Sequence, residues 1–316
     1  MYLPGVSLVP MTNNNIIPEI DSIFKASTRH HGVFNPNAPT KEKQCSSSKA
    51  PVTENDWIMH LSGRRGLGLA PILDDDTCRW AAIDVDNHEE GGSVPLGDIA
   101  ERMAMYRFPG IVCRSKSGSV HIYVFFTSGF SAHDVVELLK KWAVVLKLKK
   151  YHPQNAKPEI FPKQTMLNGE GYPNWINLPY FGISEANPHG DRFAFFNGEK
   201  LTVTQFIAWA KTNIIGPVVF DELKNYKQPP SCIVAFQYYG IKEGGRNNAV
   251  YNVTRYWSLV RPHQGLKLIR EFNKDCLSPP LPDYEIRTLS DKMRKGYKKG
   301  YICKGCLLYT SPSPRD

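Results

Sequence analysis

Short apolar runs between residues 79 and 126 carry a polar side chain at every second position. Residues 81–86 read Ala-Ala-Ile-Asp-Val-Asp, and residues 119–126 read Ser-Val-His-Ile-Tyr-Val-Phe-Phe. A period of two is typical of a strand that turns one face to the core. Asp84 and Asp86 should therefore share one face of a first strand, and Ser119 and His121 one face of a second.

The same pattern predicts the neighbouring elements. Apolar residues at helical spacing indicate a helix over 96–106 and a long helix that starts near Ser131. Period-two patterning and turn residues predict strands at 79–86, 110–114, 119–126, 158–161, 174–178 and 193–196.

Two earlier segments have less periodicity. Residues 35–55 are rich in Pro, Lys, Ser and Asn, which predicts an exposed loop or extended arm. Residues 57–72 contain three glycines and a proline, which predicts a short helix or turn that leads into a Gly-rich loop.

The order strand, helix, strand, strand, helix, strand is that of a split β-α-β (RRM-like) sheet, with helices on one face and the other face open. We therefore expect an α+β fold, with this sheet as the catalytic core and an α/β extension before it. Alternation places the aliphatic strand residues toward the helices. The side chains expected on the open face are Asp84, Asp86, Ser119, His121, Tyr123, Glu159, Trp175 and Asn177.

The chain changes character near residue 229. Three helices are expected there, with apolar faces formed by Val250, Val253, Trp257 and Val260, by Leu266, Ile269 and Phe272, and by Ile286, Leu289 and Met293. Residues 242–305 hold 14 basic and 6 acidic side chains, a net of +8 within a total of +9, and the basic residues are densest over 292–304. This charge fits a nucleic-acid contact surface or a merely solvated basic helix.

The expected domains are a catalytic domain over 1–228, with its core at about 56–215, and a helical basic domain over 229–305. Residues 306–316 resemble an in-frame translation of a sequencing-library adaptor. We expect them to be an artefact and the natural protein to continue differently. The Cys303/Cys306 spacing is therefore not interpreted as a zinc half-site.

Cysteine usage and hydropathy indicate the cellular compartment of the protein. The seven cysteines form no framework of pairs, which favours a reducing compartment. No apolar run reaches membrane-spanning length and the first 20 residues lack a signal-peptide pattern. We expect a cytoplasmic protein without a membrane partner, in a prokaryotic or virus-infected cell.

Two carboxylates side by side on a strand can hold metal ions. Alternate residues on one face lie roughly 6.5–7 Å apart, so Asp84 and Asp86 could share Mg²⁺ or Mn²⁺, which prefer oxygen ligands. Two such ions can stabilise the attacking and leaving oxygens of a phosphoryl transfer. By parity, Glu159 is the candidate third ligand.

Polar residues near these carboxylates suit a nucleotide. His121 could ligate metal, act as an acid or base, bind a phosphate, or simply be a satisfied sheet histidine. The turn 115–118, which contains Ser117, offers amides and hydroxyls for a triphosphate. Lys163 could add a positive charge or be a plain surface lysine. Trp175 and Tyr123 could stack on a base or pack in the core.

Several motifs together resemble the archaeo-eukaryotic primase superfamily. They are Asp-Val-Asp at the end of one strand, Ser-x-His at the start of another, and a later acidic residue on a strand. The sequence is most similar to primase-polymerases of phages, plasmids and mobile elements over about 20–305. Supporting stretches are 57–72, 159–164 and 176–180, and in the helical primase C-terminal domain 243–248, 272–273, 279–281 and 301–303.

The resemblance implies a template-directed nucleotidyltransferase that makes primers in DNA replication, either as a primase alone or as a primase-polymerase that also extends them. It implies that Asp84, Asp86 and Glu159 bind two divalent ions and that Ser119 and His121 hold the nucleotide phosphates. Many members have an aspartate in the third motif, so Asp191 is a rival to Glu159. No zinc cluster is predicted. Single-stranded DNA and nucleoside triphosphates would be the substrates, and a helicase often follows the helical domain.

Two other functions remain open from the residues alone. A metal-dependent nuclease or rolling-circle initiator could use a similar sheet, but an initiator needs two histidines one residue apart, and His30-His31 lacks that spacing. A non-catalytic nucleic-acid-binding module would explain the basic helical region. It would leave the alternating polar residues of the strands unexplained.

Overall fold

In a computed structural model of the chain, the strand that carries Asp84 lies inside a six-stranded antiparallel sheet. This strand is β4 (Thr77–Val85), and the strand order is β10-β9-β5-β6-β4-β7. The other strands are β5 (Ile111–Arg114), β6 (Val120–Ser131), β7 (Glu159–Phe161), β9 (Ala194–Phe196) and β10 (Glu199–Leu201). The predicted strands at 79–86, 110–114, 119–126, 158–161 and 193–196 are all present in this sheet.

The structure describes residues 13–86, 93–116, 118–151, 157–167, 172–226, 230–260 and 265–296. Contacts divide the chain into two units, Met1–Tyr226 and Lys227–Asp316. Within the described ranges, no helix is long and apolar enough to cross a membrane. The expected adaptor-derived tail, 306–316, lies outside them.

Two helices cover one face of the six-stranded sheet. They are α4 (Leu96–Tyr106) and α5 (Ala132–Val145), and the 3-10 helix η1 (Leu148–Tyr151) follows α5. The strand residues on this face are aliphatic and fully buried, as Ile83 and Ile122 show. Phe108, just after α4, stacks on Trp142 of α5 with ring centroids 4.8 Å apart. The predicted helices and their sheet face are therefore confirmed.

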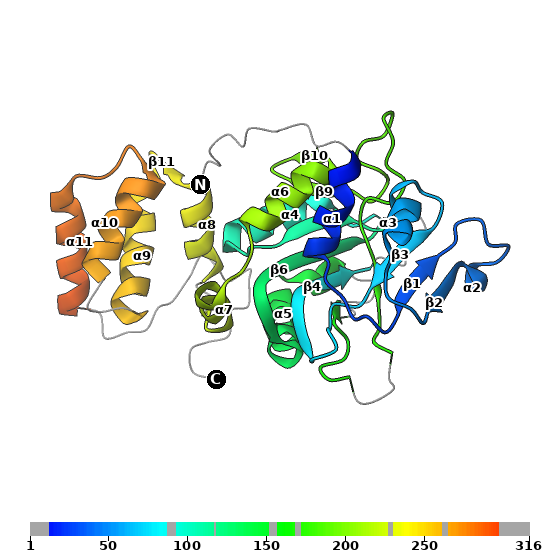
Figure 1. The fold of residues 1–316 in the computed structure, drawn as a ribbon. Helices are drawn as coiled ribbons and strands as arrows, with labels where there is room; N and C mark the ends of the chain where they lie inside the picture. Colours follow the sequence, from blue (N-terminus) through cyan, green and yellow to red (C-terminus); the bar gives the residue numbers. More distant parts are fainter. Residues whose placement is uncertain are drawn as a thin grey trace. The chain divides into compact units, whose positions relative to one another are not determined.

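The opposite face was expected to be open. It is not, because two more helices cover half of it. These are α1 (Asn13–Ile23) and α6 (Val203–Thr212), which lie side by side against the sheet (Figure 1). Phe24 meets Trp80 and Phe125 edge-on at 5.1 and 5.5 Å, and Phe206 of α6 stacks on Phe24. Burial of these large rings excludes water from this half of the face. The Asp84 end of the same face lies outside this aromatic cluster.

A second, four-stranded sheet forms the N-terminal extension, in the order β2-β1-β3-β8. Its elements are β1 (His31–Phe34), α2 (Lys41–Gln44), β2 (Cys45–Ser48), α3 (Glu54–Leu61), β3 (Gly66–Leu69) and β8 (Ile176–Asn177). Residues 35–55 are thus not a plain loop, and the Gly-rich segment is a strand. The predicted strand at 174–178 is real but belongs to this second sheet, so its assignment to the catalytic sheet was wrong.

Glycines in this sheet make room for Trp175, which explains why a Gly-rich segment forms a strand. A Cβ on Gly32 or Gly68 would meet the indole of Trp175 at 2.0 or 2.2 Å. The indole nitrogen donates to the Ser47 hydroxyl at 3.0 Å. Trp175 is therefore a packing residue against the strands, as a glycine in a strand interior often permits.

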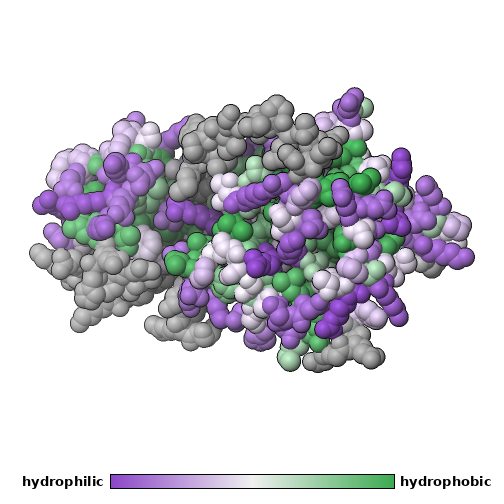
Figure 2. Space-filling model, in the orientation of Figure 1, coloured by the Kyte–Doolittle hydropathy of each residue, from purple (hydrophilic) through white to green (hydrophobic). Residues whose placement is uncertain are grey.

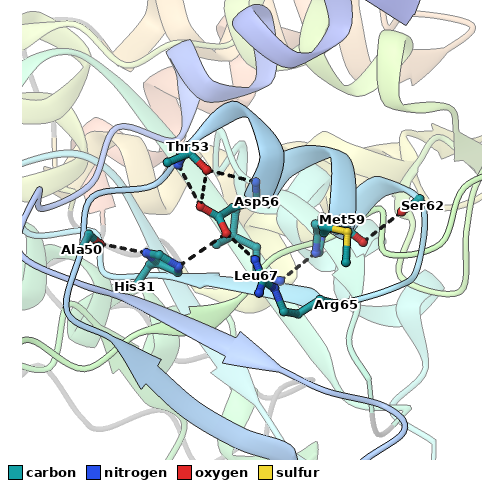
Figure 3. Close-up of polar contacts among 9 residues, drawn as sticks. His31, Ala50, Thr53, Asp56, Met59, Ser62, Arg65 and Leu67 are labelled. Atoms are coloured by element: carbon teal, nitrogen blue, oxygen red, sulfur yellow. Dashed lines mark hydrogen bonds and ion pairs between the residues drawn. The ribbon is translucent and has the colours of Figure 1, made fainter.

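A buried polar cluster attaches α3 to the second sheet (Figure 3). Thr53 and Asp56 form a reciprocal capping box at the start of the helix. Asp56 also accepts from Arg65 at 2.7 Å and lies 3.8 Å from His31. Burial acts to raise the pKa of Asp56, but the Thr53 hydrogen bonds and the His31 and Arg65 charges hold it below its ordinary value. These groups partner one another, so the cluster is structural.

The first unit ends with α7 (Pro217–Lys224), and the second is helical. It contains α8 (Ser231–Tyr239), β11 (Ile241–Lys242), α9 (Arg246–Val260), α10 (Gly265–Cys276), β12 (Leu277–Ser278) and α11 (Asp283–Gly296). Helices α9, α10 and α11 pack together (Figure 1). The mixed α+β fold with antiparallel sheets and a helical C-terminal region is as predicted.

The core of the second unit contains most of the predicted apolar face. Its buried members are Ile233, Ala249, Val250, Val253, Ile269, Phe272, Leu277, Leu281 and Ile286. Trp257 and Leu289 pack against them half-buried. Leu266 is 38% exposed, so its predicted burial was wrong. The side chains of Val260, Met293 and the dense basic stretch 292–304 lie outside the described residues.

Hydrophilic residues dominate the surface in Figure 2, and smaller hydrophobic patches lie among them. This mixture is ordinary for a protein surface. Candidate chemistry therefore has to be sought in particular side chains rather than in one large apolar patch on this face.

Candidate active site

Asp84 stands in a row of three polar residues on three adjacent strands. It lies directly opposite His121 of β6 on one side and opposite Glu159 of β7 on the other. Residues directly opposite each other in antiparallel strands project from the same face. The structure thus brings Asp84, His121 and Glu159 together on one face, as the parity of the sequence had indicated.

The Asp84 carboxylate has a buried oxygen that lacks a hydrogen bond. Its side chain is 13% exposed, and among the described residues its Oδ1 atom has no hydrogen-bond partner. Burial, together with the nearby Asp86 and Glu159 charges and against a smaller opposing effect of Lys163, raises the pKa of Asp84 to about 8. Clustered carboxylates that raise one another's pKa in this way favour a bound cation.

His121 connects this carboxylate to the second sheet. Its Nε2 lies 3.4 Å from Asp84 Oδ1, and its Nδ1 lies 3.0 Å from the Tyr123 hydroxyl. That hydroxyl donates to the backbone oxygen of Asn177 on β8 at 2.9 Å. The Tyr123 oxygen can accept from Nδ1–H, which leaves a lone pair on Nε2; in the other tautomer Nε2 carries the proton and can donate to an anionic oxygen.

The imidazole is held neutral by its surroundings. Burial, together with the Arg192 charge and against a hydrogen bond to the Asn177 backbone, lowers the pKa of His121 to about 3. A neutral His121 can donate or accept a hydrogen bond but is not a cationic partner of Asp84 at neutral pH. Tyr123 is fully buried, so packing and the orientation of His121 account for it better than base stacking.

The predicted phosphate-binding residues have different environments. Ser119 is fully buried beside this row, and Ser117 lies outside the described residues. Lys163 lies 2.7 Å from the Glu159 carboxylate and is therefore occupied by an ion pair rather than held ready for a phosphate. In the turn before Ser119, the Arg114 side chain donates to the carbonyl oxygens of Val94 and Gly118, which fixes the loop from both sides.

Arg192 is a buried cation that the sequence reading missed. It is 3% exposed, its guanidinium packs over the rings of Phe181 and Phe34 at 4.6 and 5.3 Å, and its Nη1 has no hydrogen-bond partner in the described structure. Burial lowers its pKa to about 10, so it remains charged at neutral pH. Lys116 lies over the other partner ring, Phe34, at 3.8 Å.

A signal for Arg192 existed in the alternation of the strand that follows it, β9. Ala194 pairs with Cys113, and Cys113 pairs with His121, so these three residues share a face. Arg192 lies two positions before Ala194, in the bend that precedes β9, and its charge acts on His121 and Tyr123. Like Asp84 on β4, Arg192 is therefore a charged residue on the side of the sheet that faces the site.

Asp191, the rival third ligand, lies at the far side of this arrangement. It precedes β9, which is separated from β4 by β5 and β6. Three strand spacings of about 4.8 Å place β9 roughly 14 Å from β4. Asn187 donates to its carboxylate at 3.4 Å. The sheet order therefore favours Glu159, on the strand next to Asp84.

The residues present fit a divalent ion in part. Over the described ranges, no three His, Cys, Asp or Glu side chains are close enough to form a ready metal site. Asp84 nevertheless offers a buried oxygen without a hydrogen bond, and Asp86 and Glu159 act on it electrostatically. Hard carboxylate oxygens are what Mg²⁺ and Mn²⁺ prefer. Glu159 would have to turn from Lys163 to join them.

Comparison with known families identifies a match over most of the first unit. The model of the family described as "TOTE conflict system, Archaeo-Eukaryotic Primase domain" matches residues 23–209. This range contains Asp84, His121, Glu159 and Arg192. A search of curated proteins finds no match.

A solved structure is also similar. It is the archaeo-eukaryotic primase (AEP) domain of the cyanophage S-2L primase-polymerase, at 13% identity. The match covers 54% of this chain and 91% of that chain, with a TM-score of 0.30. This TM-score is too low for the solved structure to indicate anything about the site. The assignment of the site rests on the family match and on the contacts described above.

Proposed function

The chain belongs to the archaeo-eukaryotic primase domain family of TOTE conflict systems, and from this premise we propose that it is a template-directed nucleotidyltransferase that synthesises primers. The observation that carries the proposal is the buried Oδ1 atom of Asp84, which has no hydrogen-bond partner among the described residues and is flanked by His121 and Glu159 on adjacent strands. Such an unsatisfied carboxylate costs stability, and a role at an active site accounts for its retention.

Asp84, Asp86 and Glu159 would hold two divalent ions, Mg²⁺ or Mn²⁺. When bound, such ions supply a Lewis acid and neutralise the charge that builds on phosphate oxygens during transfer. The protein's own contribution is to hold the Asp84 oxygen in place, next to a neutral His121, on the rigid centre of the sheet.

The nucleotide triphosphate would lie between the Ser119–His121 strand and Arg192. The Arg192 guanidinium is rigid because Phe34 and Phe181 pack on it, and its unpartnered Nη1 can donate to a phosphate oxygen. Lys116 on the adjacent turn adds a second positive charge. The His121 imidazole, neutral and fixed by Tyr123, would donate or accept one hydrogen bond to the same group.

The core sheet supports the assignment to a split β-α-β catalytic fold. Four of its strands follow the order β5-β6-β4-β7, and α4 and α5 are the two connections on one face. This is the strand order that the split β-α-β motif requires. The helical second unit would be the primase C-terminal domain.

Single-stranded DNA and nucleoside triphosphates are the proposed substrates, and a helicase the proposed partner. Two biological settings fit this activity. Replication of a mobile element is the first, and the family description names a conflict system, which is the second. Both use the same chemistry, so the assay below applies to either.

The test is primer synthesis on single-stranded DNA with labelled nucleotides and Mg²⁺ or Mn²⁺. The double variant Asp84→Ala/Asp86→Ala should lose synthesis and keep DNA binding. A matched control, Asp98→Ala/Asp221→Ala, removes two exposed aspartates from helices and should keep both activities. Normal incorporation by the first variant would refute the mechanism. Strand cleavage in place of elongation would indicate a nuclease, and a mobility shift alone a binding module.

A further inference from the structure

A lysine-lined groove runs between α5, η1 and β7. It encloses about 850 Å³ and its floor contains apolar side chains such as Val144, which is 75% exposed. We name it the lysine groove after the six lysines that line it, Lys140, Lys147, Lys149, Lys150, Lys157 and Lys163. Among the described residues that line it, the one acid is Glu159, which is paired with Lys163.

Two of the six lysines have acidic partners, since Lys140 pairs with Glu137 at 2.9 Å and Lys163 with Glu159 at 2.7 Å. The excess positive charge of the hollow therefore comes from the other four, whose like charges repel one another unless an anion is present. A polyanion relieves this repulsion and releases its own counterions on binding. The groove is therefore complementary in charge to a chain of phosphates.

The position of the groove relates it to the proposed active site. The groove lies on the α5 side of the sheet, the face opposite to that of Asp84, and reaches the edge strand β7, where Glu159 stands opposite Asp84. The lysines come from three successive segments, so their charge is spread along the groove rather than gathered at one point. This distribution suits an extended strand better than a single phosphate group.

We propose that the lysine groove binds the sugar-phosphate backbone of single-stranded DNA and brings it along the β7 edge of the sheet. The lysines contact phosphates, and the exposed apolar floor contacts sugars or bases, a combination typical of sequence-independent strand binding. Naming this strand as template or primer rests on the proposed function; binding itself does not.

The experiment compares two triple variants of the full chain. Lys149→Gln/Lys150→Gln/Lys157→Gln removes three groove charges. The control, Lys25→Gln/Lys43→Gln/Lys200→Gln, removes three exposed charges that do not line the groove. Affinity for a fluorescein-labelled oligo(dT) is measured by anisotropy at several salt concentrations, without metal or nucleotide, and circular dichroism and thermal melts establish that both variants are folded.

The groove variant should bind at least about 10-fold more weakly at low salt, and its salt slope should fall by about 2, because each lost phosphate contact on a single strand contributes about 0.7. The control should stay within about twofold of the wild type. Unchanged affinity and slope in the groove variant, or an equal loss in the control, would overturn the proposal. The proposal would also be overturned if tripolyphosphate bound in the groove and oligo(dT) did not compete with it there. Equal loss for oligo(dT) and oligo(rU) would support a backbone contact.

Failure here can be told apart from failure of the proposed function. If the groove variant binds normally but Asp84→Ala/Asp86→Ala loses synthesis, the active site stands and the groove does not. If binding falls in the groove variant while the aspartate variant still incorporates nucleotides, the groove stands and the proposed mechanism does not.

Discussion

Glu159 stands directly opposite Asp84 in the β4–β7 ladder, yet its carboxylate lies 2.7 Å from the ammonium of Lys163. The backbone thus places Glu159 beside the buried aspartate, while the ion pair directs its charge toward a half-exposed lysine. An exposed ion pair of this kind is worth about 0–1 kcal/mol. A divalent ion can therefore recruit Glu159 at little cost, which makes its role as a third ligand open to measurement.

The first prediction concerns that role. Glu159→Gln should weaken Mn²⁺ binding at least about 10-fold, because the variant loses one anionic oxygen ligand. Lys163→Gln should keep or tighten binding by up to about fivefold, since a competing cation is removed. Titration of the full chain with Mn²⁺, followed by electron paramagnetic resonance of the free ion, measures both.

Asp191→Asn is the matched control for Glu159→Gln, because both remove one carboxylate charge. It should leave Mn²⁺ affinity unchanged, since β9 is separated from β4 by two strands. Loss of affinity in Asp191→Asn, with none in Glu159→Gln, would reverse the assignment of the third ligand.

The second prediction concerns the orientation of His121. Tyr123→Phe removes the hydroxyl that lies 3.0 Å from His121 Nδ1 and donates to Asn177. The apparent KM for nucleotide should rise about 5–10-fold, and His121→Ala should raise it at least as far, because a fixed hydrogen bond to the phosphates is lost. Steady-state kinetics over a range of nucleotide concentrations at saturating template provide the measurement.

Tyr180→Phe is a suitable comparison for Tyr123→Phe. Tyr180 is equally buried, and its hydroxyl donates to a backbone oxygen, that of Leu201, at 3.1 Å. Each variant should lose about 1 kcal/mol of stability, because a buried acceptor is left unpaired. An equal rise in KM for both would mean that His121 orientation has no specific part in nucleotide binding.

The sequence was sufficient for the parts of this molecule that local alternation controls. Helix 96–106, the strands around it and the shared face of Asp84, His121 and Glu159 all follow from a period of two or 3.6. It failed where a contact is made between segments far apart in the chain. Trp175 lies in the second sheet because Gly32 and Gly68 make room for it, and no local pattern reports that pairing.

The covering of the site face was missed for a similar reason. Phe24, just after α1, and Phe206 of α6 are 182 residues apart, and their rings meet over Trp80 and Phe125. Nothing near Phe24 in the sequence indicates which sheet it covers. The ion pair of Lys163 with Glu159 was missed as well, because parity gives the face of a side chain but not its partner.

The third prediction is an acid-induced loss of stability through His60. This histidine is fully buried, its Nδ1 accepts from Leu67 N–H at 2.9 Å, and its Nε2–H donates to Pro179 O at 2.8 Å. Burial lowers its pKa from 6.5 to about 4, and Arg192 contributes. The unfolded chain therefore binds a proton first, so stability is complete above pH 6.5 and falls as the pH decreases toward 4.

This titration should remove about 2–4 kcal/mol between pH 6.5 and 4. Urea unfolding followed by tryptophan fluorescence at several pH values measures it. His60→Gln should be less stable at pH 7.5 and show a flatter pH dependence than the wild type over that range. His133→Gln, which changes a 70% exposed histidine side chain on α5, should show the wild-type dependence. Parallel curves for His60→Gln and wild type would contradict the assignment to His60.

The fourth prediction tests the packing of Trp175. Gly32→Ala places a Cβ 2.0 Å from the indole, which must shift, so the variant should lose about 1–3 kcal/mol of unfolding free energy. Gly97→Ala on α4 adds a Cβ with no other heavy atom within 4 Å and should instead gain up to about 1 kcal/mol. Urea unfolding of both variants gives the two values.

The clash can be assigned to Trp175 itself by a double-mutant cycle. Trp175→Ala alone should lower the free energy of unfolding, because the ring covers two strands. In the Trp175→Ala background, Gly32→Ala should cost about 1–2 kcal/mol less than Gly32→Ala costs in the wild type. Additive losses would place the strain elsewhere. Because β8 follows Trp175 directly and carries the Asn177 oxygen that fixes Tyr123, Gly32→Ala should also raise the nucleotide KM. The nucleotide KM of Gly97→Ala should equal that of the wild type, because this variant leaves these contacts intact.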